Sequence, residues 1–363
     1  MKKVFISAGD PSGDLHAARL MKSIHELAPE IEFIGIGGAE MTKAGLKSIV
    51  DIEEISVVGF WEVIKRYGFF KKLLQKASEI IASDDVAAFV PVDYPGFNIR
   101  LAKAAKASQK KVIYYIAPQL WAWGKERAKK LKGNIDILLV VFPFEQKYFS
   151  DFGLRTEYIG HPLMDDPFFE TIPGNREKII SFFPGSRKQE ISKHLPLYSA
   201  VADVLEKELP EHKLYVSGAR QLPEELYSPF LINDRRAFNS NSRNLMHISQ
   251  AAVIKTGTTN LEAALAGMPF CMAYQASSFN YMIGKRLLNL DYVSLPNILA
   301  NKAIVKEFIQ NDATPNAIAD EVLKICNNPE YTNNMISEFK NIRKILGEKG
   351  AARNAAQIIV NEI

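Results

Sequence analysis

An alternation of short apolar strands with amphipathic helices runs twice along the 363-residue chain, and it constrains the fold more than any other feature. The expected strands are β-branched or aromatic and are bounded by Gly, Pro or Asp. Helical stretches such as 14–27 and 97–108 separate several of them. Strands joined by crossovers of this length pair in parallel, so the pattern predicts a mostly parallel sheet. In the first half the expected strands are Val4–Ala8, Glu32–Ile36, Val86–Val92, Val112–Ile116, Ile135–Phe142 and Thr156–Ile159.

A segment rich in Pro, Asp and Gly follows Pro162, and we interpret it as a linker that ends near Arg176. The alternation then restarts, and the chain becomes helical from about Pro315. The sequence therefore predicts an α/β protein with two doubly wound, Rossmann-like domains, 1–165 and 175–340, facing a cleft. The C-terminal helical segment, 341–363, either returns to the first domain or exchanges between the subunits of a homodimer. In the second half the expected strands are Lys178–Phe183, Lys213–Ser217, Arg236–Asn239, Ala252–Lys255 and Phe270–Ala273.

Composition excludes several classes of protein. Hydrophobic residues make up 47% and charged residues 24%, which excludes a mainly disordered chain. The formal charge of +4 is too small to indicate nucleic acid, and two cysteines cannot form a disulfide framework, which favours a reducing compartment. Since about 18 consecutive apolar residues are needed to span a bilayer, no spanning helix is expected. The six histidines are scattered and no DxD pair occurs, so no metal site is expected.

The loop after the first strand combines glycines with polar side chains at the start of a helix. Glycine lets the backbone approach a ligand closely, and a helix N-terminus offers free N–H groups and a partial positive charge. Ser12 and Asp14 are explained equally well as helix caps. If the loop binds a ligand, its candidate residues are Gly9, Asp10, Ser12 and Gly13.

Asp93 directly follows the strand Val86–Val92. A carboxylate just past the carboxyl end of a central strand lies where doubly wound folds place their chemistry, and burial can tune it as a general base. Capping of the next helix is the alternative. Trp121 and Trp123 lie on the loop after the neighbouring strand, where they either pack in the core or contact a sugar or an acyl chain.

Two turns in the second half are suited to phosphate. Ser186 and Arg187 follow a strand and supply backbone donors, a hydroxyl and a guanidinium, although a plain surface turn is the alternative. The second turn is a Gly with hydroxyl residues before a helix, and a Thr N-cap within a capping box is its alternative. A carboxylate in its first helical turn is placed to accept hydrogen bonds from a ribose diol. The candidate residues of this turn are Thr256, Gly257, Thr258, Thr259, Asn260 and Glu262.

Residues 60–76 mix aromatic side chains with five cations and one acid. Basic amphipathic helices bind anionic lipid surfaces, whereas the alternative is a helix with one face on the core and the other in solvent. Nucleic acid is not expected here, since no recognised binding motif accompanies these residues. The predicted membrane-contact residues are Trp61, Ile64, Lys65, Arg66, Phe69, Phe70, Lys71 and Lys72.

Nine segments occur in order along nearly the whole chain: 8–14, 35–41, 93–98, 118–123, 143–145, 160–162, 184–187, 257–262 and 292–297. Together they resemble the lipid-A-disaccharide synthase family. The resemblance implies a GT-B glycosyltransferase that transfers 2,3-diacylglucosamine from UDP-2,3-diacylglucosamine to 2,3-diacylglucosamine 1-phosphate (lipid X). The products are the β-1′,6-linked lipid A disaccharide 1-phosphate and UDP, formed with inversion. It also implies no metal or other cofactor, and a peripheral location at the cytoplasmic face of the inner membrane.

By the same resemblance, Asp93 is the catalytic base, and Arg187 with Ser186 and the 256–259 turn stabilises the leaving diphosphate. Glu262 holds the ribose, the 9–13 loop shapes the acceptor side, and Asn297 is a substrate-binding residue. Asp10 stands where the family usually carries Glu. Two alternatives share these motifs: another UDP-sugar enzyme, either a 2-epimerase or a soluble glycosyltransferase, and a non-catalytic protein that binds a sugar nucleotide.

Overall fold

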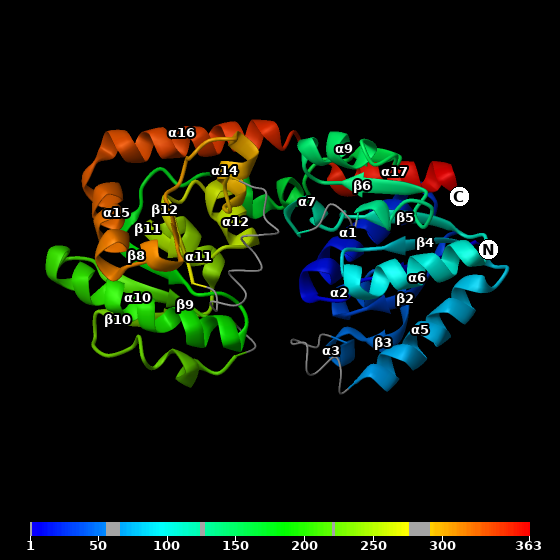
Figure 1. The fold of residues 1–363 in the computed structure, drawn as a ribbon, viewed down its shortest axis with the longest axis horizontal. Helices are drawn as coiled ribbons and strands as arrows, with labels where there is room; N and C mark the ends of the chain where they lie inside the picture. The colour runs from blue at the N-terminus through cyan, green and yellow to red at the C-terminus, as the bar shows by residue number, and fades with distance from the viewer. Residues whose placement is uncertain (1, 56–65, 124–127, 220–221, 276–290) are drawn as a thin grey trace. The chain divides into compact units, whose positions relative to one another are not determined.

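The computed structural model describes residues 2–55, 66–123, 128–219, 222–275 and 291–363. The chain divides into two compact units, Met1–Asp165 with Leu346–Ile363, and Asp166–Ile345. Each unit is built on one parallel sheet with helices against it, which confirms the predicted fold class (Figure 1). We describe the two units separately.

The sheet of the first unit has seven strands in the order β3-β2-β1-β4-β5-β6-β7. The strand order reverses between β1 and β4, and the pairing of Ser7 with Pro91 aligns the carboxyl ends of these two strands. This alignment places the loops after β1 and β4 next to each other, at the position where doubly wound sheets bind ligands. The strands are β1 (Lys3–Ser7), β2 (Glu32–Gly37), β3 (Leu46–Asp51), β4 (Val86–Pro91), β5 (Lys111–Tyr115), β6 (Ile137–Val140) and β7 (Thr156–Tyr158).

Helices cover both faces of this sheet (Figure 1). The apolar residues Leu73, Ala77 and Ile81 recur at helical spacing along one helix and pack into the core with Phe5 and Phe89. The described helices of the unit are α1 (Pro11–Leu27), α2 (Ala39–Lys43), α3 (Ile52–Ile55), α5 (Tyr67–Ala82), α6 (Pro95–Ala107), α7 (Leu120–Trp123), α9 (Pro143–Ser150), the 3-10 helix η1 (Pro162–Asp165) and α17 (Ala351–Glu362).

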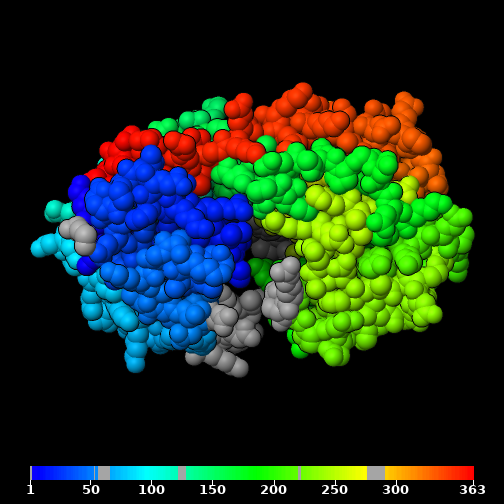
Figure 2. Space-filling view, turned by 180° about the vertical axis from the view of Figure 1, so that it is seen from behind, coloured from blue at the N-terminus to red at the C-terminus, as the bar shows by residue number. Residues whose placement is uncertain are grey.

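Of the C-terminal segment 341–363, the residues Leu346–Ile363 belong to the first unit, whereas the residues up to Ile345 end helix α16 of the second. Helix α17 packs against α1, and in Figure 2 the red end of the chain lies against the blue N-terminal segment. The Tyr158 hydroxyl donates to the carbonyl of Leu346 (2.7 Å), and Lys111 pairs with Glu362 (2.7 Å). These contacts fasten both ends of the segment.

The second unit has six parallel strands in the order β10-β9-β8-β11-β12-β13, and its order reverses between β8 and β11. The strands are β8 (Glu177–Phe183), β9 (Lys213–Ser217), β10 (Arg236–Asn239), β11 (Ser249–Ile254), β12 (Phe270–Tyr274) and β13 (Glu307–Ile309). The described helices are α10 (Lys188–Glu208), α11 (Ser242–Ile248), α12 (Thr258–Leu265), α14 (Leu295–Ala300), α15 (Pro315–Asn327), α16 (Pro329–Ile345) and the 3-10 helices η2 (Pro167–Phe169), η3 (Glu224–Tyr227) and η4 (Gln310–Asp312).

Three features differ from the sequence expectations. The strands β3 and β13 were not expected, because β3 is an edge strand with a single buried residue and β13 has only three residues. Residues 166–176, interpreted as linker, are part of the second unit. There Phe169 is buried, and the Arg176 guanidinium donates to the backbone carbonyls of Met246 (2.7 Å) and Ala266 (2.9 Å).

Candidate active site

Asp93 lies at the switch point of the first unit in a strained backbone conformation. Asp93 and Tyr94 have φ values of 41° and 49°, in the left-handed region that side chains other than Gly rarely adopt. Ile116, after the neighbouring strand β5, has a φ of 62°. Strain of about 1–3 kcal/mol per residue persists only where the surroundings enforce it, and it is concentrated at functional sites.

Hydrogen bonds to main-chain carbonyls hold Asp93 in this conformation. Asn98 is fully buried on α6, and its amide Nδ2 lies 3.2 Å from the carbonyl oxygen of Ser7, 3.3 Å from that of Val92 and 2.9 Å from that of Asp93. The Tyr114 hydroxyl donates to the same Asp93 carbonyl at 2.6 Å. The cap position of α6 is taken by Tyr94 without a side-chain cap bond, so the interpretation of Asp93 as a helix cap is wrong.

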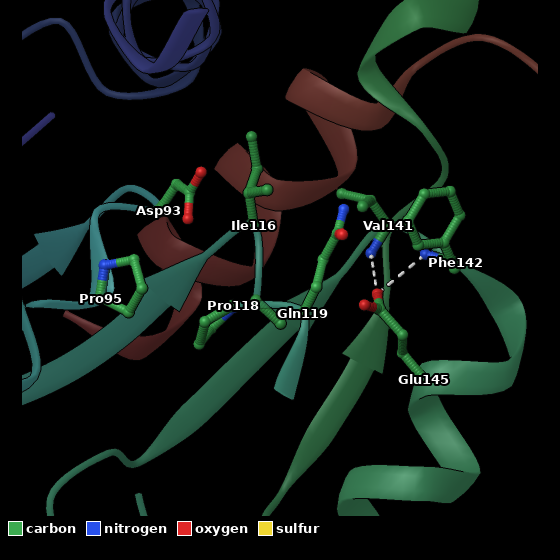
Figure 3. Close-up of a pocket in the computed structure, with 9 residues that line it drawn as sticks. Asp93, Pro95, Ile116, Pro118, Gln119, Val141, Phe142 and Glu145 are labelled. Carbon is green, nitrogen blue, oxygen red and sulfur yellow. Dashed lines mark hydrogen bonds between the residues drawn. The ribbon is translucent and has the colours of Figure 1, made fainter. Parts of the chain in front are cut away.

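The Asp93 side chain lines a pocket of about 290 Å³. Burial raises the pKa of this carboxyl to about 6, the negative charge of Asp10 adds to the shift, and the Tyr94 backbone N–H opposes it. In Figure 3 the side chains of Asp93, Ile116 and Gln119 extend from the ends of β4 and β5 into the same space. The pocket is lined by Asp93, Pro95, Ile116, Ala117, Pro118, Gln119, Val141, Phe142 and Glu145.

Glu145 is a second carboxyl of this pocket, to which the sequence analysis gave no role. It is fully buried, and it accepts hydrogen bonds from the Trp121 indole (2.8 Å) and from the backbone N–H groups of Val141 (3.2 Å) and Phe142 (3.1 Å; Figure 3). Burial raises the pKa of Glu145 to about 7, although these hydrogen bonds act in the opposite direction. Trp121 also packs edge-to-face on Phe144, so its ring and its N–H both have protein partners.

The loop after β1 is arranged by its own carboxylates. Asp10 caps α1 by accepting from the Gly13 backbone N–H at 2.6 Å. Asp14 accepts instead from the N–H groups of Gly38 (2.8 Å) and Met41 (3.1 Å), so it stabilises the start of α2 rather than that of its own helix. Ser12 is exposed on the first turn of α1. The cap of α1 is therefore Asp10, not Ser12 or Asp14.

Gly9 is required by a close approach to the strained turn. A Cβ atom there would lie 2.1 Å from Cγ of the Tyr94 ring, which is far inside van der Waals contact. The loop after β1 and the turn of Asp93 therefore touch. The structure thus brings together Gly9, Asp10, Gly13 and Asp93 around the carboxyl ends of β1 and β4.

In the second unit the Ser186–Arg187 turn follows β8. Gly185 has a φ of 117°, and a Cβ there would lie 2.5 Å from the Glu190 carboxylate. That carboxylate accepts from the Ser186 backbone N–H (3.3 Å) and pairs with Arg187 (3.3 Å). The Arg187 side chain is 62% exposed, so its guanidinium remains accessible to a ligand.

The neighbouring turn follows β11. The N-cap of α12 is Gly257, with a φ of 143°, and glycine has no side chain that could cap the helix. The interpretation as a capping box with a Thr N-cap is therefore wrong. Asn260 is fully buried, and its amide donates to the carbonyls of Lys255 (3.0 Å) and Gly257 (3.1 Å). Asn260 therefore shapes the turn, and Gly257 and Thr258 are exposed to solvent.

Glu262 and Asn297, both expected to bind substrate, have different surroundings. Glu262 is half-buried on α12, and burial raises its pKa, although the positive charge of Arg243 acts in the opposite direction. Asn297 is fully buried. Its amide donates to Glu307 (2.8 Å) and accepts from the backbone N–H groups of Ile304 (2.8 Å) and Val305 (2.9 Å). Asn297 thus links α14 to the segment that follows this helix.

The predicted membrane-contact residues are only partly described. Trp61, Ile64 and Lys65 lie outside the described residues. On α5, Phe69 and Phe70 are half-buried against the core, whereas Lys71 and Lys72 are exposed and the Tyr67 side chain is 62% exposed. We call Arg66, Phe69, Phe70, Lys71 and Lys72 the α5 patch. Of the helices in the described ranges, none has the length and apolar character needed to cross a membrane.

Among the described residues, no group of three or more His, Cys, Asp or Glu is arranged to hold a metal ion. The first unit's pocket is lined by two carboxyls, Asp93 and Glu145, and the second unit carries two turns, at 185–187 and 256–259. The carboxyls offer proton acceptors, and the turns offer donors to an anion.

The sequence matches a family model described as lipid-A-disaccharide synthetase over residues 4–362. Lipid-A-disaccharide synthases from Coxiella burnetii (strain CbuG_Q212) and Persephonella marina are 33% and 34% identical to the chain. The first alignment covers 100% of this chain and 99% of the relative, and the second covers 99% and 98%. These matches confirm the resemblance drawn from the motifs.

Two solved structures show the same fold at low sequence identity. The UDP-GlcNAc 2-epimerase from Neisseria meningitidis bound to UDP-GlcNAc has a TM-score of 0.64 and 11% identity, and 99% of each chain is covered. The glycotransferase of kitacinnamycin has a TM-score of 0.62 and 16% identity, with 100% of this chain and 99% of that chain covered. At such identities the likeness shows the fold alone.

Proposed function

The chain belongs to the lipid-A-disaccharide synthase family, and from this premise we propose that it is a hexosyltransferase that joins two acylated glucosamines. The donor is UDP-2,3-diacylglucosamine and the acceptor is 2,3-diacylglucosamine 1-phosphate. The products are lipid A disaccharide 1-phosphate and UDP. The observation that carries the proposal is the family match over residues 4–362, which includes the strained, pocket-lining Asp93.

In the proposed reaction Asp93 is the base. The acceptor 6-hydroxyl oxygen attacks the anomeric carbon of the donor, its proton passes to the Asp93 carboxylate, and the bond from that carbon to the diphosphate oxygen breaks. One in-line displacement of this kind inverts the anomeric centre. A pKa near 6 makes Asp93 more basic than an ordinary aspartate while leaving it ionised at neutral pH.

The second unit stabilises the leaving group in this proposal. Negative charge develops on the diphosphate as the bond breaks, and preorganised donors that face this charge lower the barrier. Arg187, the Ser186 turn and the 256–259 turn supply such donors at the ends of adjacent strands. Glu262 accepts from the ribose hydroxyls. Gly9, Ser12 and Gly13 shape the acceptor side, while Asn260 and Asn297 act through the loops that they hold.

We also propose that the α5 patch rests on the cytoplasmic face of the inner membrane, where both lipid substrates reside. Exposed lysines next to aromatic side chains are suited to the headgroup region of an anionic bilayer. Lys71 and Lys72 are exposed, and the Arg66 guanidinium lies 4.6 Å from the centre of the Phe69 ring. The proposed membrane contact also includes Trp61, Ile64 and Lys65, which precede α5 in the sequence.

The test is release of UDP by the purified chain in detergent micelles. We expect release only when both acylated sugars are present, with a chelator having no effect, and a disaccharide product detected by mass spectrometry. If the UDP-sugar is converted to its 2-epimer without an acceptor, the chain is an epimerase. If UDP-sugar binds but no UDP is released with either lipid, the chain is a binding protein; both results contradict the proposal.

A further inference from the structure

One carboxylate joins the two turns of the second unit. Glu190 Oε1 is contacted by the Arg187 guanidinium at 3.3 Å and by the Lys255 ammonium at 3.0 Å, and Oε2 accepts from the Ser186 backbone N–H at 3.3 Å. A guanidinium, an ammonium and a backbone N–H thus converge on a single anionic group. Donor sets of this kind also bind phosphate.

The Lys255 side chain is held between the two turns and does not extend into solvent. Its backbone N–H donates to the carbonyl of Phe183 at 3.0 Å, which places it beside the end of β8. Its side chain is only 15% exposed, which is unusual for lysine, and its ammonium lies 5.8 Å from the centre of the Tyr274 ring. The next residue is Thr256, the first of the hydroxyl turn. The ammonium therefore lies at the junction of the two candidate phosphate turns.

We propose that Lys255 is a diphosphate-binding residue, and that Glu190 holds Lys255 and Arg187 in place until a nucleoside diphosphate takes over both cations. The inference rests on the proposed function, because it assigns the donor's diphosphate to these turns.

Charge and spacing support the exchange. Two cations around one carboxylate leave a local excess of one positive charge, so the junction attracts a further anion. Cations that share one carboxylate oxygen are close enough to contact two oxygens of one diphosphate. A diphosphate can accept bonds from both cations and also from the backbone N–H groups at the start of α12, which Glu190 does not contact. It therefore has more partners at the junction than the carboxylate that it displaces.

The test is calorimetric binding of UDP to the full chain carrying Lys255→Met, which removes the charge but keeps an unbranched apolar stem. We expect UDP to bind at least tenfold more weakly, with a shallower dependence on salt, while Lys255→Arg stays within about threefold of wild type. Uridine, which lacks phosphate, is expected to bind both variants equally. The matched control is Lys207→Met, at an exposed position near the other end of α10, which should leave UDP binding unchanged.

The outcomes separate this inference from the proposed function. If wild type binds no UDP, the proposed function fails and this inference fails with it. If wild type binds UDP and a folded Lys255→Met chain binds it equally well, Lys255 only braces the turns and the inference alone is wrong. A fall in uridine affinity equal to that of UDP would also overturn it, since the effect would then be structural.

A second variant keeps the exchange testable if Lys255→Met does not fold. Glu190→Gln retains an oxygen that can bridge the turns but removes the competing negative charge. We expect UDP to bind about three- to tenfold more tightly to this variant, with uridine unchanged. Weaker UDP binding would show that the Glu190 charge is needed in the bound state, and the proposed exchange would be wrong.

Discussion

Both units place strand-to-helix turns at the switch point of their sheet, but the turn of Asp93 in the first unit differs in backbone and in charge from the two turns of the second. In the first unit Asp93 and Tyr94 adopt positive φ without glycine, whereas in the second unit Gly185 and Gly257 take this conformation at φ values of 117° and 143°. The turn of Asp93 contributes a carboxyl to the pocket that Glu145 also lines. In the second unit, Arg187 and Lys255 from the two turns both pair with Glu190. Backbone strain thus accompanies a pocket-lining carboxyl in the first unit, and glycine accompanies a cluster of cations in the second.

The largest effect is expected from removing the Asp93 carboxylate of the first unit. Asp93→Asn should lower the rate of transfer by about 10²- to 10⁴-fold, the usual contribution of a general base, while UDP binding stays unchanged. The wild-type kcat/KM should fall as pH decreases through about 6, because protonated Asp93 cannot accept the hydroxyl proton. Asp84→Asn, in the exposed turn just before β4, is the matched control. Wild-type turnover in Asp93→Asn would remove Asp93 as the base.

The same substitution should stabilise the protein at alkaline pH. Burial raises the pKa of folded Asp93 to about 6 from about 4 in an unfolded chain, so keeping it ionised costs up to about 3 kcal/mol above pH 6. This cost shrinks as the pH falls below 6, because the folded carboxyl then takes up a proton, and it vanishes below about pH 4, where the unfolded chain is protonated as well. Denaturant titrations should therefore show Asp93→Asn more stable than wild type at pH 8 and nearly equal at pH 4. Equal stability at both pH values would contradict the burial of this charge.

The next feature to test is the set of hydrogen bonds that keeps the Asp93 backbone in its strained conformation. Asn98→Leu removes the amide that lies against three main-chain carbonyls and should lower kcat by about 100-fold, since a misplaced catalytic group costs about that much. Tyr114→Phe removes one bond to the Asp93 carbonyl and should have a smaller effect. The donor KM should not move in either variant, and the midpoint of the pH profile should shift in Asn98→Leu. An unaltered pH profile with equal losses in kcat and stability would indicate a purely structural role.

Asp93 and the turns at 186–187 and 256–262 were predictable because each follows an apolar strand directly, so the strand pattern alone fixes their place at a sheet edge. The partners that control them were not predictable. Asn98 lies 91 residues from Ser7, Glu145 lies 24 from Trp121, and Lys255 lies 65 from Glu190. Such pairs form only when the sheet assembles. A single sequence carries no period or spacing that links them.

Local patterns also misassigned several polar residues. Ser12, Asp14 and Asp93 were all acceptable helix caps by residue type, yet α1 is capped by Asp10 and α6 has no side-chain cap. The choice among neighbouring acceptors depends on backbone angles, which residue type does not determine. Residue type also does not predict the four side-chain hydrogen bonds of Asn297, which link it to Ile304, Val305 and Glu307.

For the second unit, Glu262→Ala should raise the donor KM about tenfold, whereas kcat should change little. The lost hydrogen bond to the carboxylate weakens binding of the ground state and of the transition state alike. Wild type should also prefer UDP over 2′-deoxy-UDP, and Glu262→Ala should lose that preference. Glu208→Ala, at the exposed end of α10, is the control. If the variant kept both its donor KM and its preference for UDP, the ribose would be held elsewhere.

The smallest expected effect concerns the α5 patch, which is separate from the turns compared above. One lysine near an anionic surface contributes about 1 kcal/mol, so Lys71→Gln should weaken co-sedimentation with vesicles containing anionic lipid about fivefold. Activity in detergent micelles should not change, and vesicles of neutral lipid should not distinguish the variant from wild type. Lys132→Gln, an exposed lysine outside α5, provides the control. Equal vesicle binding by Lys71→Gln and wild type at low salt would favour the alternative in which the cations of α5 only face solvent, because electrostatic attraction is strongest when screening is weak.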